Sequence, residues 1–325
     1  MSYPRMNIAT ALNSKYMRYA YVMLTSLFIN QTETNIHVYL LNNDLTSSDI
    51  QILSSLGEKF HQKIHFLKID PERFPDELPV NSSWTLEAYF RLMLLDLLPE
   101  EVDRLLYLDV DIIVDKSIND FYFTPFNQSL FCVCRDMCVN FPVNDVRDEL
   151  FKEHRKKNFT YFNSGVMLWN IVALRGKYTF EYYMKLMKQL DYKVLAPDQD
   201  LLNYAHYNHV KLMDEYRYDL FSRMAYYAGI TYADVKRETA IVHFAGQKPW
   251  KGDFLHYDIE KLWWDYAEKT PFYNDLLKEF VDDCISGNYV NQTVQKITQE
   301  RDKLSAELKK SAEVIQALMK ISNLQ

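Results

Sequence analysis

Short apolar runs alternate with longer amphipathic segments along most of the chain. The apolar runs predict strands at residues 7–12, 36–41, 63–69, 104–115, 129–134, 210–213 and 239–243, with one more directly after Gly165. Apolar positions three and four residues apart predict helices at residues 16–30, 47–60, 85–98 and 178–190, and another from Pro197 onward. Such alternation is typical of the α/β class, in which helices flank a mostly parallel sheet and ligands bind where its strands end.

Two carboxylates interrupt the apolar run at residues 104–115. Asp109 and Asp111 are one residue apart, and in an extended strand their side chains would point to the same side. Two carboxylates about 4 Å apart repel by roughly 4 kcal/mol at an effective dielectric near 20, and a divalent cation between them relieves this. The alternative is a strand end that faces water, because two aspartates in this pattern are common.

A second polar cluster follows the predicted strand at residues 239–243. The strand ends at His243, and a turn at Gly246 leads to Lys248. One imidazole, two carboxylates and phosphate oxygens make a suitable shell for manganese or magnesium, and the nitrogen ligand favours manganese. Lys248 would then neutralise a leaving phosphate. A lone histidine is more often structural, so both interpretations stay open.

Other polar positions have two interpretations each. Arg91 lies in a predicted helix, where it is either an ordinary salt-bridged arginine or a cation for a diphosphate. Asp198, Gln199 and Asp200 follow Pro197 at a predicted helix start. They either serve only as a helix cap or have a further role in a site, because three polar residues are more than a cap requires.

Composition describes an ordinary globular chain of 325 residues, 48% hydrophobic and 25% charged, which is long enough for one catalytic domain with a tail. The net charge of -7 and the pI of about 5.7 argue against non-specific binding of nucleic acid, which needs a basic surface. No signal-peptide pattern and no bilayer-length apolar run occur, so we expect a cytoplasmic location. The four cysteines lack a zinc-site spacing and are expected to be buried free thiols.

Several motifs in a fixed order carry a resemblance to a known family. They are Ala11–Tyr16, Tyr89–Leu92, Tyr107–Asp111, Phe162–Gly165, Pro197–Asp200 and His243–Trp250. With them, the chain resembles the retaining glycosyltransferases of family 8 from about residue 7 to residue 280. The resemblance implies a GT-A fold, manganese as the metal (with magnesium as a substitute), and transfer of glucose or galactose from a UDP-sugar. The acceptor would be a glycan, glycoprotein or glycolipid, and the new linkage would be α.

The resemblance also implies roles for single residues. The metal ligands would be Asp109, Asp111 and His243. The nucleotide-sugar contacts would be Ala11, Asn13, Tyr16, Arg91, Asp109, Val110, Asp136, Asn163, Ser164, Gly246 and Lys248. The catalytic residues would be Gln199, Asp198 and Asp200. Asn13 departs from the pattern, since family members often carry an acidic residue there.

Two mechanisms and two other functions remain open at this point. In front-face attack, the leaving phosphate takes the acceptor proton and Gln199 stabilises the cationic sugar carbon; in the rival mechanism, Asp200 is a covalent nucleophile. A haloacid-dehalogenase-like phosphatase would instead use Asp109 as its nucleophile. A nucleotide-sugar binding protein without activity would keep all donor contacts.

The C-terminal residues predict an amphipathic helix. We expect a catalytic domain at residues 1–285 and a helical tail at residues 286–325. The stripe on this tail has alternating spacings of three and four: Val294, Ile297, Arg301, Leu304, Leu308, Ser311, Ile315 and Leu318. The tail would dock on its own domain, join subunits as a coiled coil, or lie on the inner face of a membrane.

Overall fold

The computed structural model describes residues 3–80, 85–252, 256–286 and 288–322, with side chains given for residues 294–312 of the last range. The chain divides into two compact units. One contains Met1–Gly246 and Tyr257–Phe272, and the other contains Gln247–His256 and Tyr273–Gln325. The expected functional division after residue 285 stays a prediction.

The first unit is built on a sheet of seven strands in the order β3-β2-β1-β4-β7-β6-β8. The strands are β1 (Arg5–Ala11), β2 (Asn35–Asn42), β3 (Lys63–Lys68), β4 (Arg104–Leu108), β6 (Phe131–Arg135), β7 (Phe162–Asn170) and β8 (Val210–Met213). Neighbouring strands are parallel except where β7 pairs with β4 and with β6. The predicted α/β class with a mostly parallel sheet is confirmed.

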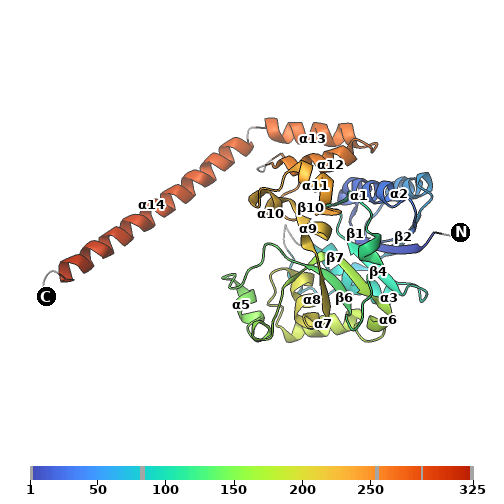
Figure 1. Cartoon of the computed structure of the whole chain (residues 1–325), viewed down its shortest axis with the longest axis horizontal. Helices are drawn as coiled ribbons and strands as arrows, with labels where there is room; N and C mark the ends of the chain where they lie inside the picture. Colours follow the sequence, from blue (N-terminus) through green and yellow to red (C-terminus); the bar gives the residue numbers. More distant parts are fainter. Residues whose placement is uncertain (1–2, 81–84, 253–255, 287, 323–325) are drawn as a thin grey trace. The chain divides into compact units, whose positions relative to one another are not determined.

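Helices cover both faces of this sheet, which is why its strands are continuous apolar runs. On β4, Leu106 and Leu108 pack with α1 (Met17–Asn30) and α2 (Ser47–Lys59) on one face. Leu105 and Tyr107 pack on the other face, as the period of two requires. That second face is covered by η3 (Leu86–Met93), α3 (Leu94–Leu97), α6 (Ile171–Leu174), α7 (Phe180–Gln189) and α8 (Pro197–His206). In Figure 1, α1 and α2 lie above the sheet and α7 and α8 below it.

The direction of β7 gathers polar residues at one edge of the sheet. β1, β4 and β6 run the same way, so their last residues lie at this edge. Because β7 runs the opposite way, its first residues lie there too, and Arg135 at the end of β6 pairs with Phe162 at the start of β7. Asp109 after β4, Asp136 after β6 and Asn163 in β7 are therefore brought together.

Asp109 and Asp111 are not in an extended strand, so this part of the prediction is wrong. β4 ends at Leu108, residues 109–111 form a turn, and the chain continues into a smaller sheet of order β5-β10-β9. Its strands are β5 (Ile112–Val114), β9 (Leu220–Phe221) and β10 (Ile241–His243). The backbone N–H of Asp109 still donates to Gly165 of β7, whereas the carbonyl of Asp111 already accepts from Phe244 after β10, both at 2.9 Å. The chain turns because it passes from one sheet to the other.

Three further expectations need correction. Residues 85–98 form the 3-10 helix η3 followed by α3 rather than one α-helix, because Tyr89 to Met93 are all buried and an amphipathic α-helix would expose one face. Asn163 to Gly165 lie inside β7, because its pairing with β6 begins at Phe162. Cys132 and Cys134 are buried free thiols as expected, but Cys138 and Cys284, in a turn and near a helix end, are exposed.

The remaining helices of the first unit are short and connect the sheets. They are η1 (Ser14–Tyr16), η2 (Pro71–Arg73), α4 (Asn119–Tyr122), α5 (Val146–Leu150), η4 (His154–Lys156), α9 (Glu215–Tyr218), α10 (Ser222–Tyr227), α11 (Tyr232–Glu238), η5 (Asp258–Glu260) and α12 (Lys261–Ala267). Residues 216–232 contain parts of α9 and α11 and all of β9 and α10.

The second unit contains two helices, α13 (Tyr273–Ile285) and α14 (Asn288–Ser322). His256 packs on α13, since the rings of His256 and Phe280 are 5.1 Å apart. A Cβ on Gly252 would lie only 2.6 Å from the backbone nitrogen of Cys284, so a side chain at this position would push the two segments apart. Within the described ranges, we find no helix with both the length and the apolar character needed to cross a bilayer.

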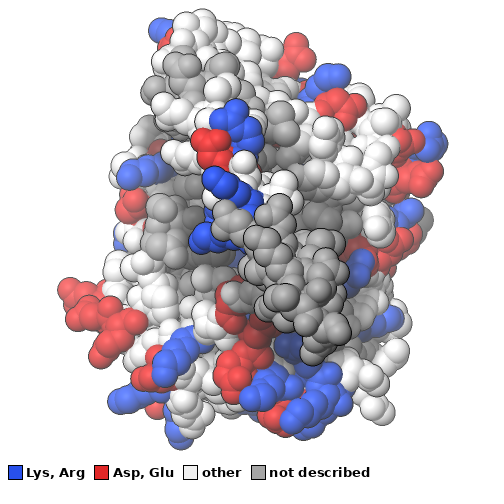
Figure 2. All heavy atoms as spheres, turned by 90° about the vertical axis from the view of Figure 1, so that its left-hand side faces the viewer, with Lys and Arg blue, Asp and Glu red and all other residues white. Residues whose placement is uncertain are grey.

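Charged side chains of both signs cover the surface. In the face that Figure 2 draws, acidic and basic groups lie side by side in several places. Near α5, for example, Arg155 pairs with Asp148 at 3.2 Å and Lys152 pairs with Glu149 at 3.2 Å. The two charges of such a pair largely cancel, so these pairs add little to the electrostatic field around the protein.

Candidate active site

Asp109, Asp111 and His243 meet where the two sheets join. Each offers one ligand atom, and these atoms all lie within 4.8 Å of one another. Nε2 of His243 is 3.4 Å from Oδ1 of Asp111 and 4.0 Å from Oδ2 of Asp109. The side chains of His243 and Asp111 are buried, whereas that of Asp109 is 27% exposed, so the cluster opens to solvent on one side. The structure thus brings together the three residues that the sequence suggested as metal ligands.

Gly165 has no side chain, and this leaves room for the cluster of Asp109, Asp111 and His243. A Cβ on Gly165 would lie 2.5 Å from Cε1 of His243 and 2.6 Å from Oδ2 of Asp109. No side chain fits at such distances, because van der Waals contacts between heavy atoms begin near 3.5 Å. The structure identifies His243 and Asp109 as the two side chains that approach this glycine.

Asp219 is a site residue that the sequence analysis missed. It is fully buried, and its Oδ1 lies 2.9 Å from Nδ1 of His243. A proton shared on that side leaves the lone pair of Nε2 for a cation, which is how carboxylates orient metal-binding histidines. Asp219 lies between α9 and β9, in a stretch without periodicity. The only available signal was a single acidic residue before the apolar pair Leu220 and Phe221.

The charges of the cluster fit a bound divalent cation. Burial lowers the pKa of His243, but attraction to Asp111 and Asp219 outweighs burial and raises this pKa to about 10. Burial raises the pKa of Asp219 to about 6, against the opposing effect of His243. Among the described residues, Oδ2 of Asp219 has no hydrogen-bond partner. The buried acidic groups therefore need a positive charge, which a proton on His243 or a divalent cation at Nε2 can supply.

Arg91 connects the cluster to the start of α8. Its Nη2 lies 2.9 Å from Oδ1 of Asp109, its Nε lies 3.0 Å from Oδ2 of Asp198, and its Nη1 donates to the carbonyl of Ser164. The guanidinium also lies over the ring of Tyr107, 4.2 Å from its centroid. Burial lowers the pKa of Arg91, but Asp109 and Asp198 outweigh burial and raise it, so the side chain is always charged. Arg91 is therefore a salt-bridged arginine, as one of the two interpretations expected, but it is buried at the site; its role toward a diphosphate stays a prediction.

Gln199 is held at both ends of its amide. Its Oε1 accepts from Nδ2 of Asn163 at 3.0 Å and from the backbone N–H of Ser164 at 2.9 Å. Its Nε2 donates to Oδ2 of Asp136 at 2.9 Å, and Oδ1 of Asp136 accepts from the backbone of Cys138. These bonds assign the orientation of the amide, and they explain why β6, β7 and α8 all contribute polar residues here.

Asp198 and Asp200 have different surroundings, although both belong to the first turn of α8. Oδ2 of Asp198 accepts from the hydroxyl of Ser164 at 3.0 Å, next to Arg91. Asp200 is fully buried, and it accepts from the hydroxyl of Tyr161 at 2.5 Å and from the backbone of Leu195 and Ala196 at 2.7 and 3.0 Å. Burial raises the pKa of Asp200 to about 6 despite these bonds.

The end of β1 and the turn after it hold the expected nucleotide contacts: Ala11 is the last residue of β1, and Asn13 and Tyr16 follow. Oδ1 of Asn13 accepts from the backbone of Tyr16 at 3.3 Å, and its Nδ2 donates to Glu87 of η3 at 3.1 Å. Glu87 thus supplies a carboxylate beside the position where Asn13 departs from the family pattern. The Tyr16 side chain is 37% exposed, so part of its ring is open to a planar ligand.

Three other expected contacts are less informative. Val110 lies between the two aspartates, half-buried against the core. Gly246 has a φ of +84°, a conformation that favours glycine, and nothing lies near its missing Cβ. Lys248 belongs to the second unit, and its expected role at the diphosphate stays a prediction.

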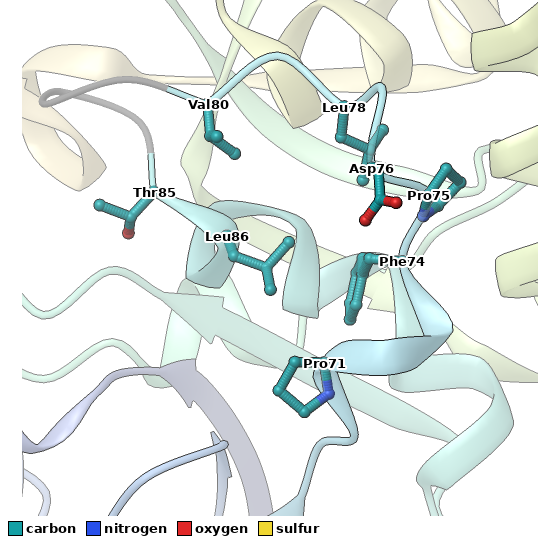
Figure 3. A pocket seen from close by; sticks show the side chains of 8 residues that line it. All are labelled: Pro71, Phe74, Pro75, Asp76, Leu78, Val80, Thr85 and Leu86. Carbon is teal, nitrogen blue, oxygen red and sulfur yellow. The ribbon is translucent and has the colours of Figure 1, made fainter.

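A separate cavity of about 460 Å³ lies between η2 and η3 (Figure 3). Its lining is mostly apolar, and the figure shows Phe74, Leu86 and Pro71 facing the cavity around the single carboxylate of Asp76. The lining residues are Pro71, Phe74, Pro75, Asp76, Leu78, Val80, Thr85 and Leu86. None of the site residues predicted from the sequence lines it, and it lacks the polar groups that a nucleotide sugar needs.

We expect Asp219→Asn to weaken metal binding while the fold is retained. The neutral amide no longer balances the charge of a protonated imidazole. It can also turn its NH2 group toward Nδ1, and the imidazole proton would then be on Nε2. Loss of such an orienting carboxylate typically lowers metal affinity by about 10- to 100-fold. The concentration of manganese that gives half-maximal activity measures the effect. An unchanged manganese requirement would show that Asp219 has no influence on the ligand.

The chain is similar to known proteins of one family. The model of glycosyl transferase family 8 matches residues 7–253. The lipopolysaccharide 1,2-glucosyltransferase of Escherichia coli is 26% identical over 286 residues, which cover 85% of this chain and 81% of that protein. The lipopolysaccharide 1,3-galactosyltransferase of Salmonella typhimurium is 25% identical over 262 residues, which cover 76% and 73%.

A solved structure shares the fold. The galactosyltransferase LgtC, crystallised with donor and acceptor sugar analogues, aligns with a TM-score of 0.70 at 21% identity and covers 82% of this chain and 96% of its own. This similarity confirms the expected GT-A architecture. Because the family model spans well over half of the sequence, the chain belongs to glycosyltransferase family 8 and is a hexosyltransferase.

Proposed function

We propose that the protein transfers glucose or galactose from a UDP-sugar to a saccharide acceptor, with manganese as the metal and with retention to give an α-linkage. The observation that carries this proposal is the junction of Asp109, Asp111 and His243, which Arg91 connects to the amide network of Gln199. The cluster of Asp109, Asp111 and His243 suits a diphosphate with its cation. The polar network around Gln199 suits a sugar with many hydroxyls. The two named relatives transfer glucose and galactose, respectively.

Asp109, Asp111 and His243 would hold the manganese ion, with magnesium as a substitute. The ion supplies positive charge against the two phosphates of UDP, which makes UDP a better leaving group. The fit rests on the three convergent ligand atoms, on the orientation of His243 by Asp219, and on the space beside Gly165. Lys248 would add a second positive charge at the diphosphate.

Arg91 has a positioning role in this proposal. Its nitrogens are bound to protein groups, so it fixes the carboxylates of Asp109 and Asp198 instead of reaching far into the donor site. Asp198, Asn163 and Asp136 then present fixed oxygen and nitrogen atoms to the sugar hydroxyls. Fixed dipoles of this kind stabilise a charged transition state without the cost of reorganisation.

Gln199 carries the catalytic role in our preferred mechanism. As the bond between sugar and phosphate breaks, positive charge develops on the anomeric carbon, and the carbonyl oxygen of Gln199 stabilises it from the side opposite to UDP. The departing phosphate oxygen takes the proton of the acceptor hydroxyl, which attacks from the same face. The bonds from Asn163, Ser164 and Asp136 support this role, because they lock the amide in one orientation.

We expect Gln199→Ala to lower kcat far more than Asp200→Asn does. Loss of a fixed dipole at the reacting centre costs about 100- to 1,000-fold in kcat, whereas we expect Asp200→Asn to stay within about tenfold. Asp200 is fully buried and accepts three hydrogen bonds, which supports a structural role and argues against a nucleophile. Steady-state kinetics of both variants test this. Abolished transfer in Asp200→Asn, with Gln199→Ala merely slow, would instead favour the covalent mechanism.

For the acceptor, we propose a saccharide chain of the lipopolysaccharide type. Both named relatives act on lipopolysaccharide, and this chain covers more than two thirds of each. A glycoprotein is the other acceptor class expected from the sequence. Transfer of labelled hexose to isolated lipopolysaccharide cores and to a glycoprotein panel would separate the two classes.

Release of UDP from a panel of UDP-sugars, with and without manganese, tests the proposed reaction. We expect release from UDP-glucose or UDP-galactose that depends on the metal and increases when the acceptor is added. A matched assay with Asp111→Asn should show almost no release. Tight binding of UDP-sugars without any turnover would favour a binding protein that lacks activity, and release without metal would remove the assigned role of the three ligands.

A further inference from the structure

The helix α14 carries an apolar stripe that is exposed to solvent. The side chains of Val294, Ile297, Leu304 and Leu308 are 56%, 61%, 66% and 73% exposed. The helix has 35 residues, which corresponds to a length of roughly 52 Å. Helices in proteins owe most of their stability to the burial of such a face rather than to intrinsic propensity. The exposed stripe therefore favours a partner that covers it.

The width and period of the stripe indicate which partner fits. Positions 294, 297, 301, 304, 308 and 311 alternate in steps of three and four, and the sequence continues this pattern at 315 and 318. This is the two-in-seven pattern of a coiled-coil seam, whereas a helix that docks on a domain core usually has a wider apolar face. Repeated seven-residue spacing keeps the stripe facing a second helix along its whole length.

Charges beside the seam favour a second copy of the same helix in parallel. Arg301 occupies a seam position, and Glu300 occupies the flanking position just before it. In a parallel pair, Arg301 of one copy lies next to Glu300 of the other, so the polar interruption is neutralised and fixes the register. Within one chain Arg301 pairs with exposed Asp302, at 2.7 Å, and this contact leaves the Arg301 side chain 70% exposed. The residues on the other flank, Thr298, Ser305 and Ala312, are uncharged, so the main repulsion in the pair is that between the two Arg301 side chains, which face each other and which the two Glu300 carboxylates offset.

A membrane surface fits the same stripe less well. Helices that lie on membranes combine a strongly basic polar face with aromatic residues on the apolar face. Residues 288–322 contain six Lys or Arg and four Asp or Glu, and no aromatic residue occurs between 294 and 312. Arg301 and Ser311 would also interrupt the face that has to enter the lipid.

We propose that α14 pairs in parallel with α14 of a second copy of this chain, forming a two-stranded coiled coil along the stripe. The pairing buries the four exposed apolar side chains against their counterparts and gives a homodimer. This interface is independent of the proposed reaction, because it uses none of the residues placed at the active site.

Measurement of the molar mass of the full chain in solution tests the pairing. One chain has a mass of 38.7 kDa, and we expect the wild type to show twice this value. The double variant Leu304→Glu/Leu308→Glu places charges in the seam and should be monomeric. The control Gln299→Glu/Ala306→Glu adds the same two charges on the outer face of the helix and should stay dimeric. Metal-dependent UDP release in all three proteins would verify that the catalytic unit is folded.

Cross-linking determines the orientation. Ser311→Cys, in a background in which exposed Cys138 and Cys284 are replaced by serine, should form a disulfide between two chains, because identical seam positions face each other only in a parallel pair. Ala306→Cys on the outer face should not cross-link. A monomeric wild type at all concentrations, or a seam variant that stays dimeric, would overturn the proposal. So would a monomeric wild type that binds vesicles of anionic phospholipid through this stripe.

Discussion

Gly165→Ala is expected to abolish metal-dependent transfer while the sheet stays folded. The added methyl would lie 2.5 Å from the imidazole of His243 and 2.6 Å from the carboxylate of Asp109, so at least one of them must move away. Since ligand atoms have to be placed within a few tenths of an ångström, we expect a loss of about 100-fold or more in manganese affinity or in activity. Titration of activity and of UDP binding with manganese measures this effect.

Gly229→Ala is a suitable control for this experiment. It adds the same methyl group where nothing lies within 4 Å, at a residue with a φ of +71°. Backbone strain should cost this variant about 1 kcal/mol of stability, but its response to manganese should equal that of the wild type. If Gly165→Ala bound manganese and turned over normally, the three assigned ligands would not form the metal site.

Arg91→Met is expected to destabilise the protein strongly as well as to inactivate it. The guanidinium is the buried positive charge between Asp109 and Asp198, and both carboxylates lose their partner when it is removed. Removal of one member of a buried ion pair costs about 3 to 5 kcal/mol. The fall in the free energy of unfolding should be smaller with saturating manganese and UDP, because the bound ion restores positive charge near Asp109. Chemical denaturation with and without these ligands measures both quantities.

Arg237→Met provides the matched surface control. Arg237 makes ion pairs of similar length with Asp234 and Glu238, but its side chain is 63% exposed. Exposed pairs contribute little to stability, so the variant should unfold at nearly the same denaturant concentration as the wild type. An equally small effect of Arg91→Met would mean that the two buried carboxylates do not depend on the arginine.

The family assignment also decides between functions that the sequence motifs left open. A haloacid-dehalogenase-like phosphatase with Asp109 as its nucleophile is wrong, because the chain belongs to glycosyltransferase family 8. Asp109 forms an ion pair with Arg91, and its Oδ2 lies 4.0 Å from Nε2 of His243. The inactive binding protein differs from the proposed enzyme only in turnover, so the UDP-release assay distinguishes them.

The sequence by itself determined the fold class and suggested most of the polar residues that the structure brings together. Fully buried strands must be apolar on both faces, so the strands of the main sheet could be found as continuous apolar runs. Polar residues that end such runs, as Asp109 and His243 do, had to lie at a sheet edge. The order of the motifs then indicated the family, which the comparison confirmed.

Only the tertiary structure decided how these residues act on one another. In the sequence, Asp219 is one acidic residue among many and Gly165 is one glycine. Their roles arise because segments far apart in the chain meet His243. The same holds for Arg91, which could be a surface residue until three elements enclose it. Local patterns report the period of a strand or helix, but they contain no information about which distant side chains share a buried volume. In this protein, which distant side chains share a buried volume depends on the antiparallel direction of β7 and on the passage of the chain from one sheet to the other after Leu108.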